Sequence, residues 1–206
     1  MSVDEDFPAG FFDREDPTPD DRFYGPDRLV THIDEGAIDA VGALYHELGV
    51  HGEVLDLMSS WVSHFRVVPA RLVVLGLNDH ELAANRQAAG RVIHDLNRQP
   101  TLPFEDETFD DAVCCVSVDY LIRPVEVFTE VARVLRPDGR FVVTFSNRCF
   151  PTKVIRGWAL ASSAGCVDIV RRYFALSGGF ARPDAELRTA PTSRGDPLWA
   201  VWARRT

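Results

Sequence analysis

The sequence predicts an α/β fold, a three-layer sandwich in which helices cover both faces of a mostly parallel sheet with an antiparallel hairpin at one edge. Short apolar runs that read as strands buried on both faces alternate with helical patterns up to residue 145. Two further apolar runs near the C-terminus are joined by a polar turn without a helix, which predicts the hairpin and a total of seven strands. A chain of 206 residues buries about 70% of the surface that its unfolded form exposes, so it can fill one complete core.

Each element has its own signal in the sequence. Thr31 and Asp34 have the Ser/Thr-x-x-acid spacing of a helix start, apolar residues then recur at helical intervals, and Gly49 is a typical stop. Pro124 opens a second helix, which ends near Arg136, where a cation is favourable beside the carbonyl end of the helix. The other predicted elements are a helix over residues 153–176 and strands over residues 54–57, 72–75, 91–94, 112–116, 141–145, 185–190 and 198–203.

Composition and charge favour a soluble cytoplasmic protein. The chain is 46% hydrophobic and 26% charged, as ordinary globular proteins are, and its net charge of −9 argues against a nucleic-acid partner, which would require a basic face. No apolar run approaches the length of a membrane span, and the first residues lack the features of a secretion signal. The four cysteines include no Cys-x-x-Cys pair, so we expect neither a metal site nor a disulfide framework. The sequence gives no indication of the oligomeric state.

Residues 1–22 are expected to form an acidic N-terminal arm, followed by one domain over residues 23–206. The arm carries eight acidic residues and three prolines, a composition typical of a mobile segment. It also contains Phe7, Phe11 and Phe12, which leaves open that the arm folds as a lid over an apolar surface such as a substrate pocket.

Four stretches of the sequence carry a family resemblance. They are Leu102-Pro103-Phe104, Thr108-Phe109-Asp110, Tyr120-Leu121 and the run from Glu130 to Phe145 that contains LRPDGRFVVTF. In this order they resemble the class I S-adenosylmethionine-dependent methyltransferases, in particular the small single-domain group that methylates metabolites. The resemblance is strong over roughly residues 52–146. It implies a Rossmann-like fold, S-adenosyl-L-methionine as cofactor, and methyl transfer to an oxygen, nitrogen or sulfur atom of a small molecule.

The first motif of that family departs from its usual form. The resemblance maps Asp56 to the acid of the motif, but Met58, Ser60 and Val62 stand where glycines usually fall. A residue other than glycine held at glycine's backbone angles stores about 1–3 kcal/mol of strain, so we expect this loop to take a different path. The strand would end at Met58, and Ser59 or Ser60 would cap a helix immediately after it.

Such an early helix would build part of the cofactor site. The free backbone N–H groups of its first turn would bind the carboxylate of the cofactor, and the hydroxyls of Ser59 and Ser60 would add donors. Trp61 and His64, three residues apart, would share one face of the helix and could point toward the pocket.

Other cofactor contacts are implied by the resemblance at the ends of successive strands, where open α/β sheets bind their ligands. Asn78 stands where the family usually has a carboxylate for the ribose hydroxyls, and the adjacent Asp79 is a possible substitute. The further implied contacts are Asp95, Leu96 and Asn97 for adenine and Ser117 after the fourth strand.

Methyl transfer from a sulfonium requires mainly alignment and exclusion of water, and a base only where the acceptor must lose a proton. The segment from residue 20 to His32 lies where relatives place a lid, and residues 147–153 flank the other side of the pocket. Arg28 and Arg148 are the predicted substrate-binding residues, and Lys153 could also hold an anionic acceptor, although surface cations more often balance nearby acids. The candidate bases are Tyr24, His32, His64 and Tyr120.

Two other functions remain open. A catalytically silent domain of this fold that binds or regulates is favoured by the missing glycines and by Asn78. A nicotinamide oxidoreductase shares the alternation of strands and helices but would need a Gly-x-Gly-x-x-Gly turn, which is missing. After the fourth strand, residues 117–120 lack the Pro-Pro-aromatic turn of methylases that act on nucleobases, which again favours a small-molecule substrate.

Overall fold

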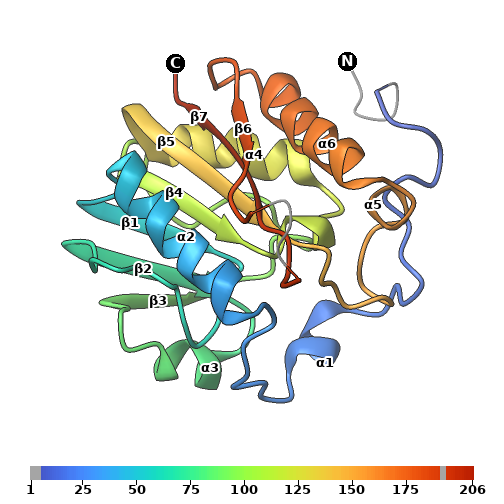
Figure 1. The fold of residues 1–206 in the computed structure, drawn as a ribbon, viewed down its shortest axis with the longest axis horizontal. Coiled ribbons are helices and arrows are strands. Elements are labelled where there is room, and N and C mark those ends of the chain that lie inside the picture. The colour runs from blue at the N-terminus through green and yellow to red at the C-terminus, as the bar shows by residue number, and fades with distance from the viewer. Residues whose placement is uncertain (1–5, 191–193) are drawn as a thin grey trace.

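A computed structural model describes residues 6–190 and 194–206 and has the predicted fold (Figure 1). The seven strands lie in the order β3-β2-β1-β4-β5-β7-β6. Strands β1 to β5 pair in parallel, whereas β7 pairs antiparallel with both β5 and β6. The strands are β1 Glu53–Leu57, β2 Arg71–Gly76, β3 Gly90–Ile93, β4 Phe109–Cys115, β5 Leu135–Phe145, β6 Asp184–Leu187 and β7 Trp199–Arg204. The helices are α1 Asp20–Tyr24, α2 Glu35–Leu48, α3 Asp79–Ala84, α4 Pro124–Val134, α5 Arg156–Ala159 and α6 Ser163–Ser177, with a 3-10 turn at Val118–Tyr120.

The helix boundaries confirm some sequence signals and correct others. Helix α2 ends at Gly49, which has the left-handed φ of +67°, and Pro124 opens α4, both as predicted. However, α2 begins four residues after Thr31, because the group that caps it is the Asp34 carboxylate, which accepts from the backbone N–H of Ala37 at 2.8 Å. The single helix predicted over residues 153–176 is wrong, since α5 and α6 are separate helices and α6 has its own serine cap.

The core has two layers, one on each face of the sheet. Helix α2 crosses one face, and α4 and α6 cover the other (Figure 1). Val41 and Leu44 of α2 pack in one buried cluster, and Phe128 of α4 and Phe174 of α6 pack in the other, with ring centroids 4.9 Å apart. Because apolar residues on both sides of each central strand are buried, the polar carboxyl ends of the strands are left to form the edge at which a ligand can bind.

The described part of the N-terminal arm packs against the body of the domain. Phe7 is only 7% exposed, and its ring centroid lies 4.7 Å from that of Phe11 and 5.8 Å from that of Tyr173 in α6. A Cβ at Gly157 would fall 2.2 Å from the ring of Phe11, so glycine is required where the arm crosses α5. The three phenylalanines of the arm therefore cover α5 and α6, and the arm continues from there into α1.

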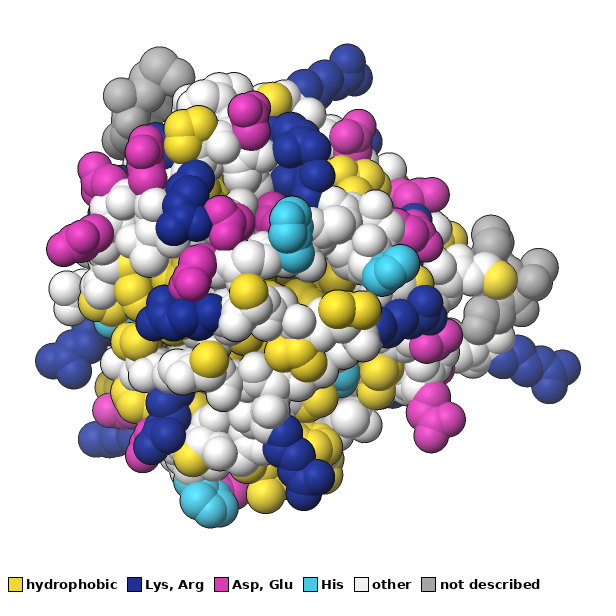
Figure 2. Space-filling view, turned by 90° about the vertical axis from the view of Figure 1, so that its left-hand side faces the viewer, with side chains coloured by type: hydrophobic (Ala, Val, Ile, Leu, Met, Phe, Trp, Pro, Cys, Tyr) yellow, Lys and Arg dark blue, Asp and Glu magenta, His cyan; other side chains and the backbone are white. Residues whose placement is uncertain are grey.

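The surface carries mixed charges. On the face shown in Figure 2, the left-hand side of Figure 1, acidic and basic side chains alternate with hydrophobic ones, and neither sign of charge forms a continuous block. Within residues 6–190 and 194–206, no helix is both long enough and apolar enough to cross a bilayer.

Candidate functional site

A cavity of about 310 Å³ lies at the carboxyl ends of the parallel strands. The structure brings nearly all of the predicted site residues together around it. Those that line it are Tyr24, Arg28, His32, Asp56, Met58, Ser59, Ser60, Trp61, His64, Asn78, Asp95, Leu96, Ser117, Tyr120 and Arg148. The residues after five different strands thus meet in one place, as the parallel order of the sheet requires.

The loop after β1 corrects the prediction of an early helix. Residues 58–64 contain no helix, so Trp61 and His64 do not share a helix face. Met58 takes the glycine-like conformation itself, with φ of +53°. The backbone N–H of Ser59 then donates to Leu75 O of β2 at 2.8 Å, which holds the loop against the neighbouring strand. The strain at Met58 is offset by this anchoring and by the packing of its side chain on the core.

A glycine on the neighbouring strand makes this path possible. A Cβ on Gly76, the last residue of β2, would lie 2.4 Å from the carbonyl oxygen of Ser59. The absence of a side chain at Gly76 therefore leaves the room that the backbone of the loop needs at Ser59. The sequence signal for it was a glycine at the end of an otherwise apolar strand, which marks a close backbone approach.

A second strained turn lies beside the first. Val116, directly after β4, has φ of +46°, which is unusual for a β-branched residue. The hydroxyl of Ser117 lies 2.8 Å from Cys115 O and 3.3 Å from Met58 O, so it bridges the ends of β4 and β1. Two left-handed residues at adjacent strand ends, both lining the cavity, are the kind of strain that is concentrated at functional sites.

The acid of the first motif is buried beneath this loop. Asp56 is 2% exposed, and its Oδ2 accepts from the Ser59 hydroxyl at 2.7 Å. Burial raises the pKa of Asp56 to about 6, although hydrogen bonds from Ser63 and Ser59 act in the opposite direction. Because the hydroxyl of Ser59 is directed to Asp56, it is not free in the way that the predicted cradle required.

Asn78 does not present a free amide to the cavity. Its Oδ1 caps α3 by accepting from the backbone N–H of Glu81 at 3.1 Å. Its Nδ2 lies within 3.1 Å of Tyr24 O and Gly25 O and 3.0 Å from a carboxylate oxygen of Asp27, so it fastens the segment after α1 across the cavity. The amide predicted for the ribose therefore connects two parts of the protein.

Glu81 is one of the cavity residues that the sequence reasoning missed. It is 9% exposed and lines the cavity, and its two oxygens accept from the backbone N–H of Arg28 at 2.6 Å and from the hydroxyl of Ser60 at 2.5 Å. Asp79, the substitute considered from the sequence, is 65% exposed, pairs with Arg91 and does not line the cavity. The signal that could have identified Glu81 is its spacing, since it lies three residues after the cap of α3 and therefore faces the same side.

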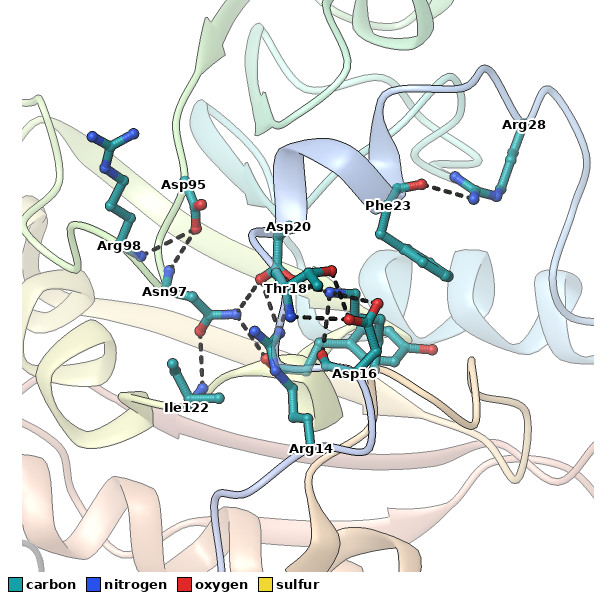
Figure 3. Close-up of polar contacts among 12 residues, drawn as sticks. Arg14, Asp16, Thr18, Asp20, Phe23, Arg28, Asp95, Asn97, Arg98 and Ile122 are labelled. Carbon is teal, nitrogen blue, oxygen red and sulfur yellow. Dashed lines mark hydrogen bonds and ion pairs between the residues drawn. The ribbon is translucent and has the colours of Figure 1, made fainter.

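The residues after β3 divide into two roles (Figure 3). Asp95 lines the cavity, and its Oδ1 accepts from the backbone N–H of Asn97 at 2.9 Å and of Arg98 at 3.2 Å. Asn97, predicted to contact adenine, does not line the cavity. Its amide donates to Asp20 and to Tyr120 O and accepts from Ile122 N, at 2.8 to 2.9 Å, so it acts as an internal brace.

A buried ionic cluster holds the arm against the loop after β5 (Figure 3). Asp20 is 4% exposed and accepts from the Arg14 guanidinium at 2.8 and 2.9 Å. The Lys153 ammonium is fully buried and lies 3.2 Å from Asp20 and 3.1 Å from Asp16. Lys153 therefore balances two acids of the arm and does not line the cavity.

Aromatic rings form one wall of the cavity. The Phe150 ring has centroid distances of 5.1 Å to His32, 5.8 Å to Tyr120, 6.1 Å to Tyr24 and 5.2 Å to Phe23. Burial raises the pKa of Tyr24 and of Tyr120, so both phenols stay protonated at neutral pH and are poor bases. Partial desolvation lowers the pKa of His32, and burial lowers that of His64, so both imidazoles are neutral at pH 7.

Comparison with known proteins finds methyltransferases. The family model described as "Methyltransferase domain" matches residues 48–143. Methyltransferase GfsG of Streptomyces halstedii is 28% identical over 150 residues, which are 65% of this chain and 54% of that protein. Sterol 4-C-methyltransferase strm-1 of Caenorhabditis elegans is 45% identical over 42 residues, 20% of this chain and 13% of that protein. The chain therefore matches only about half or less of the length of these curated relatives.

A solved structure shares the fold. It is the 1,6-didemethyltoxoflavin-N1-methyltransferase of Burkholderia thailandensis, with 1,6-didemethyltoxoflavin and S-adenosylhomocysteine bound. It is 16% identical, with a TM-score of 0.59, and the superposition covers 84% of this chain and 80% of that one. The family match covers β1 to β4 and most of β5, the part that builds most of the cavity. Residues 48–143 are therefore similar to the methyltransferase domain family, and the chain has the fold of a methyltransferase of known structure.

Proposed function

We propose that this protein transfers the methyl group of S-adenosyl-L-methionine to a small-molecule acceptor. The observation that carries the proposal is the convergence of the family's strand-end positions on one cavity, although the glycines of the first motif are replaced. Its volume of about 310 Å³ is at the lower end of the usual range for small-molecule sites, about 300–1,000 Å³, which favours a small acceptor. The names of the relatives, which are methyltransferases, support the same reaction.

The residues around the cavity fit this cofactor. It carries a positively charged sulfonium and an ammonium group, and the cavity is lined by the carboxylates of Asp56, Glu81 and Asp95. We assign the ammonium group to Asp56, the ribose hydroxyls to Glu81, and the adenine to Asp95 and Leu96. Glu81 replaces the predicted ribose contact because its carboxylate keeps acceptor positions beyond the two that Arg28 and Ser60 use, whereas the amide nitrogen and oxygen of Asn78 are both used within the protein. When bound, the cofactor supplies an electrophilic methyl group.

The chain itself supplies alignment, exclusion of water and a proton acceptor. The aromatic wall around Phe150 and the segment from residue 20 to His32 close the cavity from one side. As the nucleophile of the acceptor forms its bond to the methyl carbon, the carbon–sulfur bond breaks and its electron pair stays on sulfur. A ring nitrogen of His32, neutral at pH 7, accepts the proton that an alcohol, phenol or ammonium acceptor must lose.

Isothermal titration calorimetry with S-adenosyl-L-methionine, followed by detection of S-adenosylhomocysteine in the presence of an acceptor panel, tests the proposal. We expect binding at micromolar ligand, and turnover that falls at least tenfold in His32→Gln while cofactor affinity is unchanged. Failure to bind at millimolar ligand would refute the proposal.

A catalytically silent domain is the second candidate. It is favoured by the hydrogen bonds that already occupy the hydroxyls of Ser59 and Ser60 and the amide of Asn78. Cofactor binding without methyl transfer to any acceptor class, together with an unchanged melting curve for His32→Gln, would favour that reading.

A further inference from the structure

The guanidinium of Arg28 is held in a fixed orientation at the cavity. Its Nη1 and Nη2 donate to Pro26 O at 3.2 Å and to Phe23 O at 2.8 Å. Its central carbon lies 4.7 Å from the ring centroid of Phe23 and 5.5 Å from that of Phe150. Two carbonyls and two rings thus fix the plane of the group. Arg28 is also partly buried, so its charge is less screened than on an open surface.

The hydrogen bonds of Arg28 leave it without a counter-charge. A guanidinium has five N–H donors, and two are used by backbone carbonyls, so three remain. Among the residues that the structure describes, no carboxylate forms an ion pair with this side chain. The nearby Glu81 bonds to the backbone N–H of Arg28 and not to its guanidinium. Arg148, the other cavity arginine, already pairs through Nε with Asp196 at 2.7 Å.

We propose that the methyl acceptor is an aromatic carboxylate, with its carboxylate paired to Arg28 and its ring against the wall formed by Phe150 and Tyr120. The inference rests on the proposed function and adds the substrate class. A planar guanidinium that keeps three N–H donors can bind a carboxylate in two-point contact. The adjacent wall offers ring faces and edges, the contacts that an aromatic body prefers.

His32 completes the arrangement. Its ring contacts Phe150, with centroids 5.1 Å apart, and the charge of Arg28 is close enough to help lower its pKa. A hydroxyl or amine on the ring of the acceptor would then lie on the same side of the cavity as the neutral imidazole. Charge recognition and proton removal are thus assigned to neighbouring residues, Arg28 and His32.

The test compares carboxylates with their uncharged carboxamides. Binding of 4-hydroxybenzoate and of 4-hydroxybenzamide is measured by calorimetry on the protein saturated with S-adenosylhomocysteine, for the wild type, Arg28→Gln and Arg22→Gln. Arg22 is an exposed arginine of α1 that does not line the cavity, so its variant is the matched control. We expect the carboxylate to bind at least tenfold more tightly than the carboxamide in the wild type and in Arg22→Gln, and this ratio to fall to about one in Arg28→Gln. Arg28→Lys keeps the positive charge but not the planar guanidinium, so it should restore part of the preference for the carboxylate.

The ratio separates recognition from a structural role. Arg28→Gln also removes two bonds that hold the segment before His32, and a loosened segment would weaken both ligands equally. An equal loss for both ligands, or a wild-type ratio near one, would overturn the inference. So would a tenfold loss of S-adenosylhomocysteine affinity in Arg28→Gln, which would assign Arg28 to the carboxylate of the cofactor. If the wild type binds no S-adenosylhomocysteine or S-adenosyl-L-methionine, the proposed function fails first, and the inference fails with it.

Discussion

Gly76→Ala should disable the cofactor site by displacing the loop after β1. The added methyl would lie 2.4 Å from the carbonyl oxygen of Ser59 and 3.3 Å from a methyl of Leu82. The loop cannot easily move away from the added methyl, because the backbone N–H of Ser59 donates at 2.8 Å to the carbonyl oxygen of Leu75, the residue that precedes Gly76 in β2. Overpacking of this kind costs about 1–3 kcal/mol, and loss of the hydrogen bond about 1 kcal/mol more. We therefore expect unfolding free energy to fall by about 2–4 kcal/mol.

The matched control is Gly90→Ala in β3. A Cβ there would meet nothing nearer than a methyl of Val73 at 3.6 Å, an ordinary contact. Urea denaturation followed by circular dichroism gives the stability of both variants, and calorimetry gives their affinity for S-adenosyl-L-methionine. We expect at least a tenfold loss of affinity in Gly76→Ala only. If the two alanine variants agreed within about 0.5 kcal/mol in stability and had the same affinity, the assignment of Gly76 to the loop path would be wrong.

Three further outcomes are expected. Burial raises the pKa of Asp56 to about 6, so its ionised form destabilises the fold. Asp56→Asn should therefore be more stable than the wild type at pH 7 by about 2–3 kcal/mol, and this advantage should shrink as the pH falls from 6 to 4. A difference in urea unfolding that did not depend on pH would refute the raised pKa. Lys153→Met should lower the unfolding free energy by about 3 kcal/mol, because it leaves buried carboxylates with less counter-charge. Arg171→Met, which removes one partner of an exposed ion pair, should lower it by less than about 1 kcal/mol. Equal effects in thermal denaturation would contradict the burial argument. Asp95→Ala should weaken S-adenosyl-L-methionine binding by more than Asp79→Ala does, and calorimetry showing the reverse order would move the adenine contact elsewhere.

The fold could be predicted because its signals are local. Buried parallel strands give continuous apolar runs, Gly49 and Pro124 mark helix ends by their own backbone properties, and the polar turn before β7 identifies the hairpin. Each of these features depends on residues within a few positions of one another.

The details of the site could not be predicted, because they depend on contacts between strands. From the residues of the loop after β1 alone, we expected Met58 to avoid the left-handed backbone conformation that it adopts. The pairing of β1 with β2 places Gly76 beside it, and that relation is not visible within the loop. Asn78 and Asn97 sit at the positions expected for cofactor contacts, yet their amides are used by α1, α3 and the turn before α4, which only the assembled fold brings within reach.

The ionic cluster of Lys153 has a consequence for synthesis of the chain. Its ammonium donates to the carbonyls of Asp16 and Thr18, which precede it by 137 and 135 residues. During translation Asp16 and Thr18 leave the ribosome well before Lys153, so the cluster stays incomplete until residue 153 has emerged. Pairings of such long range form late, because loop-closure entropy must be overcome first. The wall of the cavity that contains Asp20 is therefore incomplete until residue 153 has been synthesised, and a nascent chain interrupted before that point cannot close the cavity.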